Sequence, residues 1–220
     1  MELLTVRRRF LDEQKKQAMS LKVFAAQALA DFQTTASVAP SSPQLVSAMV
    51  EHVPRVPDPV VVEFGAGTGA MTKALLEQLP ADGKLFVFEI SPRFVSHLLA
   101  KFHDPRMTLI NASVENVDSE LRSRDVQRVD AVVSSLGLSF MPPEMRKNIF
   151  DRLMPFVHEK TVLTQYQYLV AMQVSEGRVR RMDVRPLLSR YFGSIESKIV
   201  WFNLPPAYVF TCQLLPSPGR

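Results

Sequence analysis

Three of the eight glycines in this 220-residue chain lie within five positions, at Gly65, Gly67 and Gly69. They directly follow a β-branched apolar run, Val60–Phe64, and directly precede a helical pattern, Ala70–Leu79. Glycine at such a turn allows backbone conformations that side chains disfavour, and it lets a ligand approach the main chain closely. The segment therefore predicts a nucleotide-binding turn at the carboxyl edge of a parallel sheet.

Apolar runs and helical patterns alternate along the rest of the chain, which predicts parallel strands joined by right-handed helical crossovers. We expect a three-layer α/β sandwich with a Rossmann-like, seven-stranded, mostly parallel sheet. Only Asn203-Leu-Pro-Pro206 separates the final two strands, so we expect the last strand to be antiparallel. The expected strands are 60–64, 84–89, 107–111, 129–134, 161–167, 195–202 and 207–214. The expected helices are 44–53, 70–79, 92–102, 143–154 and 186–192.

The composition indicates a single globular domain, because 46% of the residues are hydrophobic and 22% are charged. The single cysteine, Cys212, excludes an internal disulfide, and no two of the four histidines have the i, i+4 spacing of a helical metal site. We therefore expect no metal. We also expect no transmembrane helix, because no run of about twenty apolar residues occurs. The first twenty residues do not resemble a signal peptide, which favours a cytoplasmic location.

The N-terminal segment carries most of the chain's surplus positive charge. Residues 1–22 contain six basic and three acidic side chains, a net charge of +3 out of +4 for the chain. An apolar stripe of helical spacing follows, at Leu21, Phe24, Ala25, Ala28, Leu29 and Phe32. Such a helix can lie on an anionic membrane surface or can cover the protein core, and the segment alone leaves both possibilities open.

A second acidic signal accompanies the glycine turn. Glu89 ends the next predicted strand, twenty residues after Gly69, where a carboxylate can accept hydrogen bonds from both hydroxyls of a ribose. Glu63 opens the turn and is suited to a ligand's ammonium group. A dehydrogenase is disfavoured because no tyrosine has a lysine four positions later, and a phosphate-binding NTPase is disfavoured because no Gly-Lys-Ser/Thr follows the turn.

The stretch Val61-Val-Glu63-Phe-Gly65-Ala-Gly67-Thr-Gly69 resembles motif I of class I S-adenosylmethionine-dependent methyltransferases. The resemblance implies S-adenosylmethionine as cofactor, with the glycines cradling its methionyl part and Glu89 holding its ribose. The full set of cofactor-binding residues that we predict is Glu63, Phe64, Gly65, Ala66, Gly67, Gly69, Glu89, Ile90, Ser113, Val114 and Ser134.

Further segments resemble bacterial phospholipid N-methyltransferases, which methylate phosphatidylethanolamine. These segments are Ala36–Ser42, Phe88–Ser91, Val129–Ser135, Gln165–Tyr168 and Asn203–Ala207. The resemblance implies methyl transfer to an aminophospholipid headgroup towards phosphatidylcholine. It also implies an N-terminal helix and hinge at residues 1–43 that dock on an anionic membrane at its inner face, ahead of a methyltransferase domain at residues 44–220.

Some features differ from the related families. Many class I methyltransferases place an aspartate near adenine where this chain has Ser113. Enzymes that dimethylate adenine in ribosomal RNA carry Asn-Leu-Pro-Tyr after the fourth strand, where this chain has Ser134-Ser-Leu-Gly-Leu138. We therefore expect no nucleic-acid partner. RNA methylation, methylation of ornithine lipid or another aminolipid, and nucleotide binding without catalysis remain alternatives.

The substrate end is predicted from fewer signals. Tyr166 and Tyr168 end the fifth strand and face the same side, so they are candidates to accept the substrate amine's proton or hydrogen bond. A basic stretch follows that could bind a lipid phosphate or could simply be solvated, at Arg178, Arg180, Arg181 and Arg185. Trp201, Phe202, Pro205 and Pro206 could line the access route of the lipid, although strand aromatics usually belong to the core.

Overall fold

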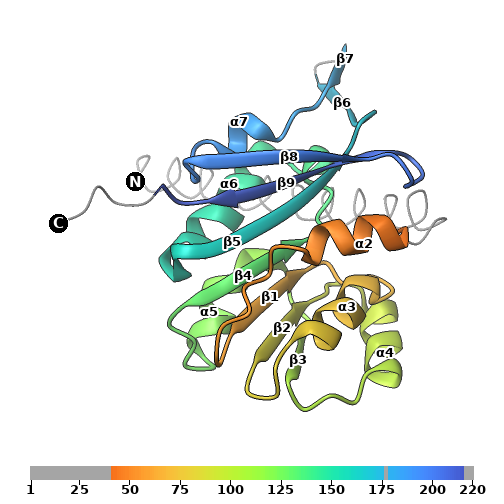
Figure 1. Ribbon diagram of the computed structural model, residues 1–220. Helices are drawn as coiled ribbons and strands as arrows, with labels where there is room; N and C mark the ends of the chain where they lie inside the picture. The colour runs from red at the N-terminus through yellow and green to blue at the C-terminus, as the bar shows by residue number, and fades with distance from the viewer. Residues whose placement is uncertain (1–40, 176–177, 216–220) are drawn as a thin grey trace, which may run out of the picture.

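The computed structural model describes residues 41–175 and 178–215, and the predicted helix within residues 1–43 falls mostly outside this range. A seven-stranded sheet runs through the centre of the described chain, with the order β3-β2-β1-β4-β5-β9-β8 (Figure 1). Its strands are β1 Val60–Phe64, β2 Lys84–Phe88, β3 Met107–Ile110, β4 Val129–Ser134, β5 Val157–Tyr168, β8 Ser194–Val200 and β9 Ala207–Gln213.

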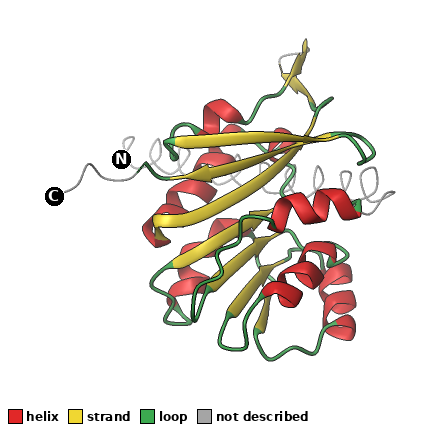
Figure 2. Cartoon of the chain, in the orientation of Figure 1, coloured by secondary structure: helices red, strands yellow, loops and turns green. Residues whose placement is uncertain are grey.

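Strands β1 to β5 are parallel to one another, whereas β9 is antiparallel to both of its neighbours, β5 and β8. The predicted three-layer, mostly parallel sandwich with an antiparallel last strand is therefore confirmed. Because parallel strands end at one edge of the sheet, the ends of β1, β2, β4 and β5 lie together, as the arrows in Figure 2 show.

Helices cover both faces of the sheet because the strand side chains alternate between two apolar clusters. One cluster joins Val61, Leu85 and Val87 to α2 Pro43–Val50, α3 Ala70–Gln78 and α4 Pro92–Lys101. The other joins Val62, Phe86 and Leu163 to α5 Val117–Arg122, α6 Pro143–Leu153 and α7 Arg185–Leu188. Short 3-10 turns complete this layer at Val114–Asn116, Leu138–Phe140 and Met154–Phe156.

Several boundaries differ from the prediction. Strand β8 ends at Val200, so Trp201 and Phe202 lie in the turn after it and are exposed, not in the core. The segment after β5 forms a two-stranded hairpin, β6 Met172–Ser175 and β7 Arg178–Arg181, where we predicted no strand; phosphate binding by the arginines of β7 stays a prediction. Helix α5 lies in a segment for which we predicted no element, and α7 is shorter than expected.

Candidate active site

The glycine turn between β1 and α3 has the left-handed backbone that its sequence predicts. Gly65, Gly67 and Gly69 have φ angles of 76°, 54° and 78°. A β-carbon at Gly69 would lie 2.6 Å from the Phe102 ring and 2.8 Å from a Leu98 methyl, so this glycine permits close packing of α3 against α4. A β-carbon at Gly67 would meet nothing within 4 Å. The middle of the turn is therefore open to a ligand.

Glu89 fixes the shape of this turn from the end of the neighbouring strand. Its carboxylate is buried and accepts hydrogen bonds from the N–H groups of Gly67 and Ser91, each at 2.8 Å. Each carboxylate oxygen can accept a second hydrogen bond, because an ionised carboxylate offers about four lone-pair sites. Glu89 can therefore hold the turn and still accept hydrogen bonds from a ligand's hydroxyl groups.

Glu63 is a second buried carboxylate at the same end of β1. Its Oε2 accepts a hydrogen bond from the Thr72 hydroxyl at 2.7 Å, while its Oε1 is buried without a partner. The pKa of Glu63 is raised to about 8, chiefly by burial; the Thr72 hydrogen bond opposes this shift, and the nearby charge of Glu89 adds to it. An unpartnered buried oxygen disfavours the charged carboxylate unless a cation is supplied.

These observations test whether the site fits S-adenosylmethionine. The donor carries a sulfonium, an ammonium and a ribose, so it requires negative charge, hydroxyl acceptors and an open backbone turn. Glu63 has a free oxygen for a cation, Glu89 has remaining acceptor capacity, and the turn at Gly67 is open. The residues therefore fit the methyl donor, and their individual roles remain predictions.

The predicted adenine side lies at the ends of β2 and β3. Ile90 is exposed next to Glu89, Val114 is buried, and the Ser113 hydroxyl accepts a 3.3 Å hydrogen bond from the N–H of Glu115. Sequence reasoning missed Asn111, whose side-chain amide donates to the carbonyls of Glu89 and Ile90 at 2.9 and 3.3 Å. Asn111 therefore fixes the backbone that presents Glu89.

Two predicted cofactor residues serve mainly in the framework. Phe64 is buried in the core and packs edge to face against Phe88, with ring centroids 5.7 Å apart. The Ser134 hydroxyl donates to Gln165 Oε1 at 2.6 Å, and the Gln165 amide donates to the Leu136 carbonyl at 2.9 Å. This network joins the ends of β4 and β5 and leaves the Ser134 hydroxyl without a free proton to donate. Ala66, within the turn, is also buried.

Tyr166 and Tyr168 lie on one face at the end of β5, as predicted, while Gln165 and Gln167, which alternate with them, lie on the other face. Their rings meet edge to face with centroids 5.3 Å apart. Burial raises the pKa of the Tyr166 hydroxyl above its ordinary value, and Tyr168 raises it further, so Tyr166 remains a neutral phenol. Both tyrosines line a small hollow with residues 136–140, Gln167 and Val184.

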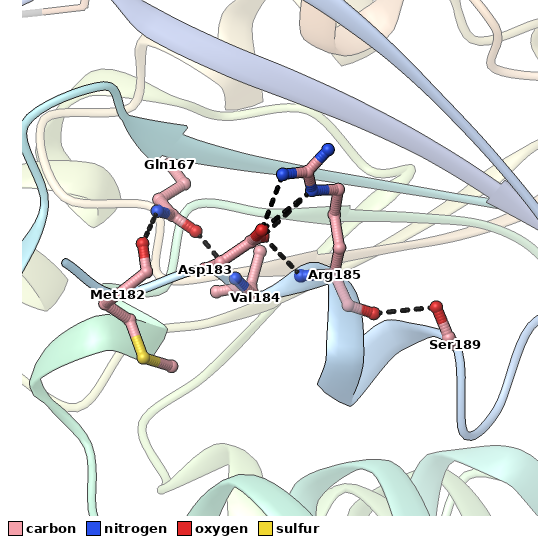
Figure 3. A network of polar contacts seen from close by, with 6 residues as sticks. All are labelled: Gln167, Met182, Asp183, Val184, Arg185 and Ser189. Atoms are coloured by element: carbon pink, nitrogen blue, oxygen red, sulfur yellow. Dashed lines mark hydrogen bonds and ion pairs between the residues drawn. The ribbon is translucent and has the colours of Figure 1, made fainter.

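Of the four basic residues predicted to bind a lipid phosphate after β5, the structure describes the side chain of Arg185 only. Arg178, Arg180 and Arg181 lie on β7, whose side chains are outside the described set. Arg185 is exposed, and its guanidinium contacts Asp183 at 2.6 Å, so its charge is already paired (Figure 3). Gln167 bonds the Met182 carbonyl and accepts from the Val184 N–H at 2.8 Å, which anchors this segment to β5.

Arg146 is a further candidate, for binding an anion, and no sequence pattern pointed to it. It lies in the first turn of α6 and is only 7% exposed, and among the described residues it is the one arginine or lysine in the buried class. Its Nη1 lies 3.4 Å from the Met182 sulfur, and no described acidic side chain forms an ion pair with it. A buried cation without a counter-ion marks a place where an anion would be favourable.

Between residues 41 and 215, leaving out 176 and 177, no group of three or more His, Cys, Asp or Glu side chains could hold a metal ion. Within the same ranges, no helix has the length and apolar character needed to cross a lipid bilayer.

Comparisons with known proteins agree with this site. Residues 61–159, which contain the glycine turn and Glu89, match the protein family described as "Methyltransferase domain". An ornithine lipid N-methyltransferase from Singulisphaera acidiphila is 28% identical over 179 residues, which cover 81% of this chain and 88% of that protein.

Two other similarities are to proteins described as RNA methyltransferases. A ribosomal RNA small subunit methyltransferase H from Aromatoleum aromaticum is 34% identical over 95 residues, which cover 43% of this chain but only 30% of that protein. The crystal structure of a putative rRNA-methylase from Clostridium thermocellum aligns with a TM-score of 0.57 at 18% identity, covering 81% of this chain and all of that one. At that identity the alignment supports the fold alone. Residues 61–159 therefore form a methyltransferase domain, the chain has the Rossmann-like fold of S-adenosylmethionine-dependent methyltransferases, and in sequence it resembles an ornithine lipid N-methyltransferase.

Proposed function

We propose that this enzyme transfers methyl groups to the amino headgroup of a membrane lipid. The observation that carries the proposal is the similarity to an ornithine lipid N-methyltransferase, which extends across most of both chains. The RNA-directed relative is similar over less than half of this chain, so it supports the donor half only. Phosphatidylethanolamine and ornithine lipid both offer a primary amine beside an acidic group, and both belong to the proposed substrate class.

S-adenosylmethionine, when bound, supplies a methyl group on a positively charged sulfur. In the proposal, Glu63 pairs with its ammonium, the open turn at Gly67 lies against its methionyl part, and Glu89 accepts from its ribose. Ile90, Ser113 and Val114 would contact the adenine. The donor's two positive charges favour a site that holds two buried carboxylates.

The tyrosine pair would receive the lipid amine. A primary amine with a pKa of about 10 is mostly protonated at neutral pH, so it must lose a proton before its lone pair can form the new N–C bond. A neutral phenol oxygen can accept a hydrogen bond from the amine, and two aromatic rings favour a cationic headgroup that lies against their faces. We therefore assign Tyr166 and Tyr168 to binding and orientation of the amine, with its proton leaving to water.

The lipid's acidic group requires a cation nearby. Arg146 is suited to this role because it is buried, lacks an acidic partner among the described residues, and contacts Met182, two residues before Val184, which lines the hollow. Arg178, Arg180 and Arg181 remain candidates for the same role, whereas Arg185 would first have to leave Asp183.

The proposal places the enzyme at the inner face of the membrane, associated peripherally through the basic segment at residues 1–43. Because residues 1–22 carry a net charge of +3, they would be attracted to anionic headgroups. Residues 44–220 would form the methyltransferase domain.

The test supplies radiolabelled S-adenosylmethionine with vesicles that contain phosphatidylethanolamine or ornithine lipid, and in a separate reaction with 16S ribosomal RNA. We expect the label in the lipid fraction, and the preferred lipid identifies the headgroup. Label found only in RNA would overturn the proposal in favour of an RNA methyltransferase. Donor binding without transfer to either acceptor class would indicate a binding protein that keeps only the fold.

A further inference from the structure

The described surface concentrates its exposed apolar side chains in two adjacent turns. Val170 follows β5, and Trp201, Phe202 and Leu204 follow β8; we call these four residues the apolar rim. Phe202 and Leu204 are each 81% exposed, Val170 is 67% exposed and Trp201 is 64% exposed. The three most exposed large apolar side chains in the described ranges thus all belong to the rim. Such clustering marks an interaction surface more strongly than isolated exposed residues do.

The strand register places the apolar rim beside the proposed amine site. Tyr168 on β5 pairs with Ala207 on β9, and Ala207 pairs with Val200 on β8, so the three residues lie in one row across the sheet. The β8–β9 turn therefore projects just beyond Tyr168, and Figure 1 shows it near the start of α2. The N–H of Leu169 donates to the Pro206 carbonyl at 2.9 Å, which joins the two turns of the rim.

Asn203 anchors the β8–β9 turn from within. It is buried, its side-chain oxygen accepts the N–H of Ser42 at 3.0 Å, and its amide donates to the Pro205 carbonyl at 2.7 Å. Phe202 and Leu204 flank this anchor and remain exposed. Because the turn is attached to the start of α2, its apolar side chains are displayed outward on a held backbone.

We propose that the apolar rim inserts into the headgroup region of an anionic bilayer and so brings the hollow at Tyr168 to its lipid substrate. The inference rests on the proposed function, which requires access to an amine that stays in the membrane. Trp and Phe side chains favour the membrane interface, and burying Phe202 and Leu204 there removes apolar surface from water.

Charge complementarity supports a bilayer as the occupant. The forty residues before 41 join the described chain next to Ser42, which contacts the rim's anchor Asn203. Residues 1–22 of that segment carry a net charge of +3. The segment that carries this net positive charge therefore joins the described chain beside the apolar rim, and anionic lipid would attract both features.

Trp201 provides a direct test because it is the single tryptophan of the chain. The full-length protein is mixed with vesicles of phosphatidylglycerol and phosphatidylcholine, without aminolipid and without methyl donor. We expect tryptophan emission to shift to shorter wavelength and to be quenched by lipids brominated near the headgroup. Unchanged emission would overturn the proposal, whether or not the protein sediments with the vesicles.

An emission shift that depends on protein concentration without lipid would indicate a second copy on the rim and would also overturn the proposal. Blue-shifted emission in dilute buffer that vesicles do not change would indicate that residues 1–40 cover the rim, with the same consequence. Both outcomes are visible before any variant is made.

Variants sharpen the test. Phe202→Gln and Leu204→Gln should each weaken vesicle partitioning by about ten-fold, because each removes an apolar side chain from the interface. Leu99→Gln is the matched control, since Leu99 is 57% exposed on α4, away from the rim, and should leave partitioning unchanged. An equal loss of vesicle partitioning in all three variants would contradict insertion of the apolar rim into the bilayer.

Methyl transfer is measured in parallel with detergent-dispersed aminolipid. Methyl transfer to lipid without a change in Trp201 emission would support the proposed function and contradict insertion of the apolar rim. A change in Trp201 emission without methyl transfer to lipid would support insertion and contradict the proposed function.

Discussion

The two halves of the sheet edge use different parts of the chain to build their sites. The donor half, at the ends of β1, β2 and β3, is shaped by backbone: three left-handed glycines and the N–H groups that Glu89 accepts. The proposed substrate half, at the ends of β4, β5 and β8, consists of side chains such as Tyr168, Arg146 and the apolar rim. We infer that one half is specialised for a constant ligand and that the other sets the acceptor.

The largest effect that separates these halves should come from Gly69. In Gly69→Ala, the new β-carbon would overlap Phe102 and Leu98 and the backbone would stay in a left-handed conformation, which together should cost about 3 kcal/mol of unfolding free energy.

The matched variant is Gly67→Ala, whose β-carbon meets open space, so it should cost about 1 kcal/mol but weaken donor binding at least ten-fold. Urea unfolding and calorimetric titration of each variant measure the two quantities. Equal losses of stability would show that the turn is not open at Gly67.

Glu63→Gln should remove a pH dependence of stability that belongs to the donor half. The pKa of Glu63 in the folded protein is raised to about 8 from its ordinary value of 4.5, so folding favours the protonated acid. The wild-type protein should therefore lose stability relative to the variant as the pH rises from about 5 to 8, by a few kcal/mol at most. Unfolding curves of both proteins at pH 5.5, 7 and 8.5 provide the measurement. A constant difference across this range would contradict the burial of an unpaired Glu63 oxygen.

Glu89→Gln tests whether the donor half depends on charge as well as shape. The amide would direct a donor at the N–H of Gly67 or Ser91, and the charge that strengthens hydrogen bonds to a ribose would be lost. We expect donor affinity to fall ten- to hundred-fold, corresponding to about 1.4–3 kcal/mol. The exposed Glu77→Gln on α3 is the control and should leave affinity unchanged. A Glu89→Gln variant that binds the methyl donor with normal affinity would show that Glu89 does not contribute to donor binding.

Tyr168→Phe should have the opposite effect, because it should impair use of the acceptor and leave binding of the methyl donor intact. Loss of one neutral hydrogen bond to the amine should lower the rate of methyl transfer by about ten-fold or less, while the donor dissociation constant stays the same. Tyr191→Phe is the matched control because Tyr191 bonds Asp151 outside the hollow. A change in donor affinity in Tyr168→Phe would show that this residue contributes to the donor half and would contradict its assignment to the acceptor half.

The same division explains which parts of the molecule could be predicted from the sequence. The fold and the glycine turn could be predicted because alternation and left-handed glycines act locally, and Gly65, Gly67 and Gly69 leave few alternatives. Glu89 was placed correctly because a strand end fixes its position, although its bonds to the turn were not foreseen.

The substrate half depends on contacts between distant segments, which no local pattern encodes. Arg146 was missed because a helix arginine is usually solvated, and only tertiary packing shows that it is buried. Trp201 and Phe202 continue an apolar strand pattern, yet β8 ends before them because the turn is attached to α2 through Asn203. Likewise, the hairpin of β6 and β7 could not be distinguished from a basic loop.

Hydrogen-exchange mass spectrometry of the full chain tests most directly whether one half of the sheet edge binds the donor and the other half binds the acceptor. S-adenosylhomocysteine, the demethylated donor, should slow amide exchange at residues 63–69 and 89–91 and leave the turn at 200–206 unchanged. Vesicles containing aminolipid should slow exchange at 136–140, 168–170 and 200–206 and leave the glycine turn unchanged. Protection of both regions by either ligand alone, or the reverse assignment, would contradict the account.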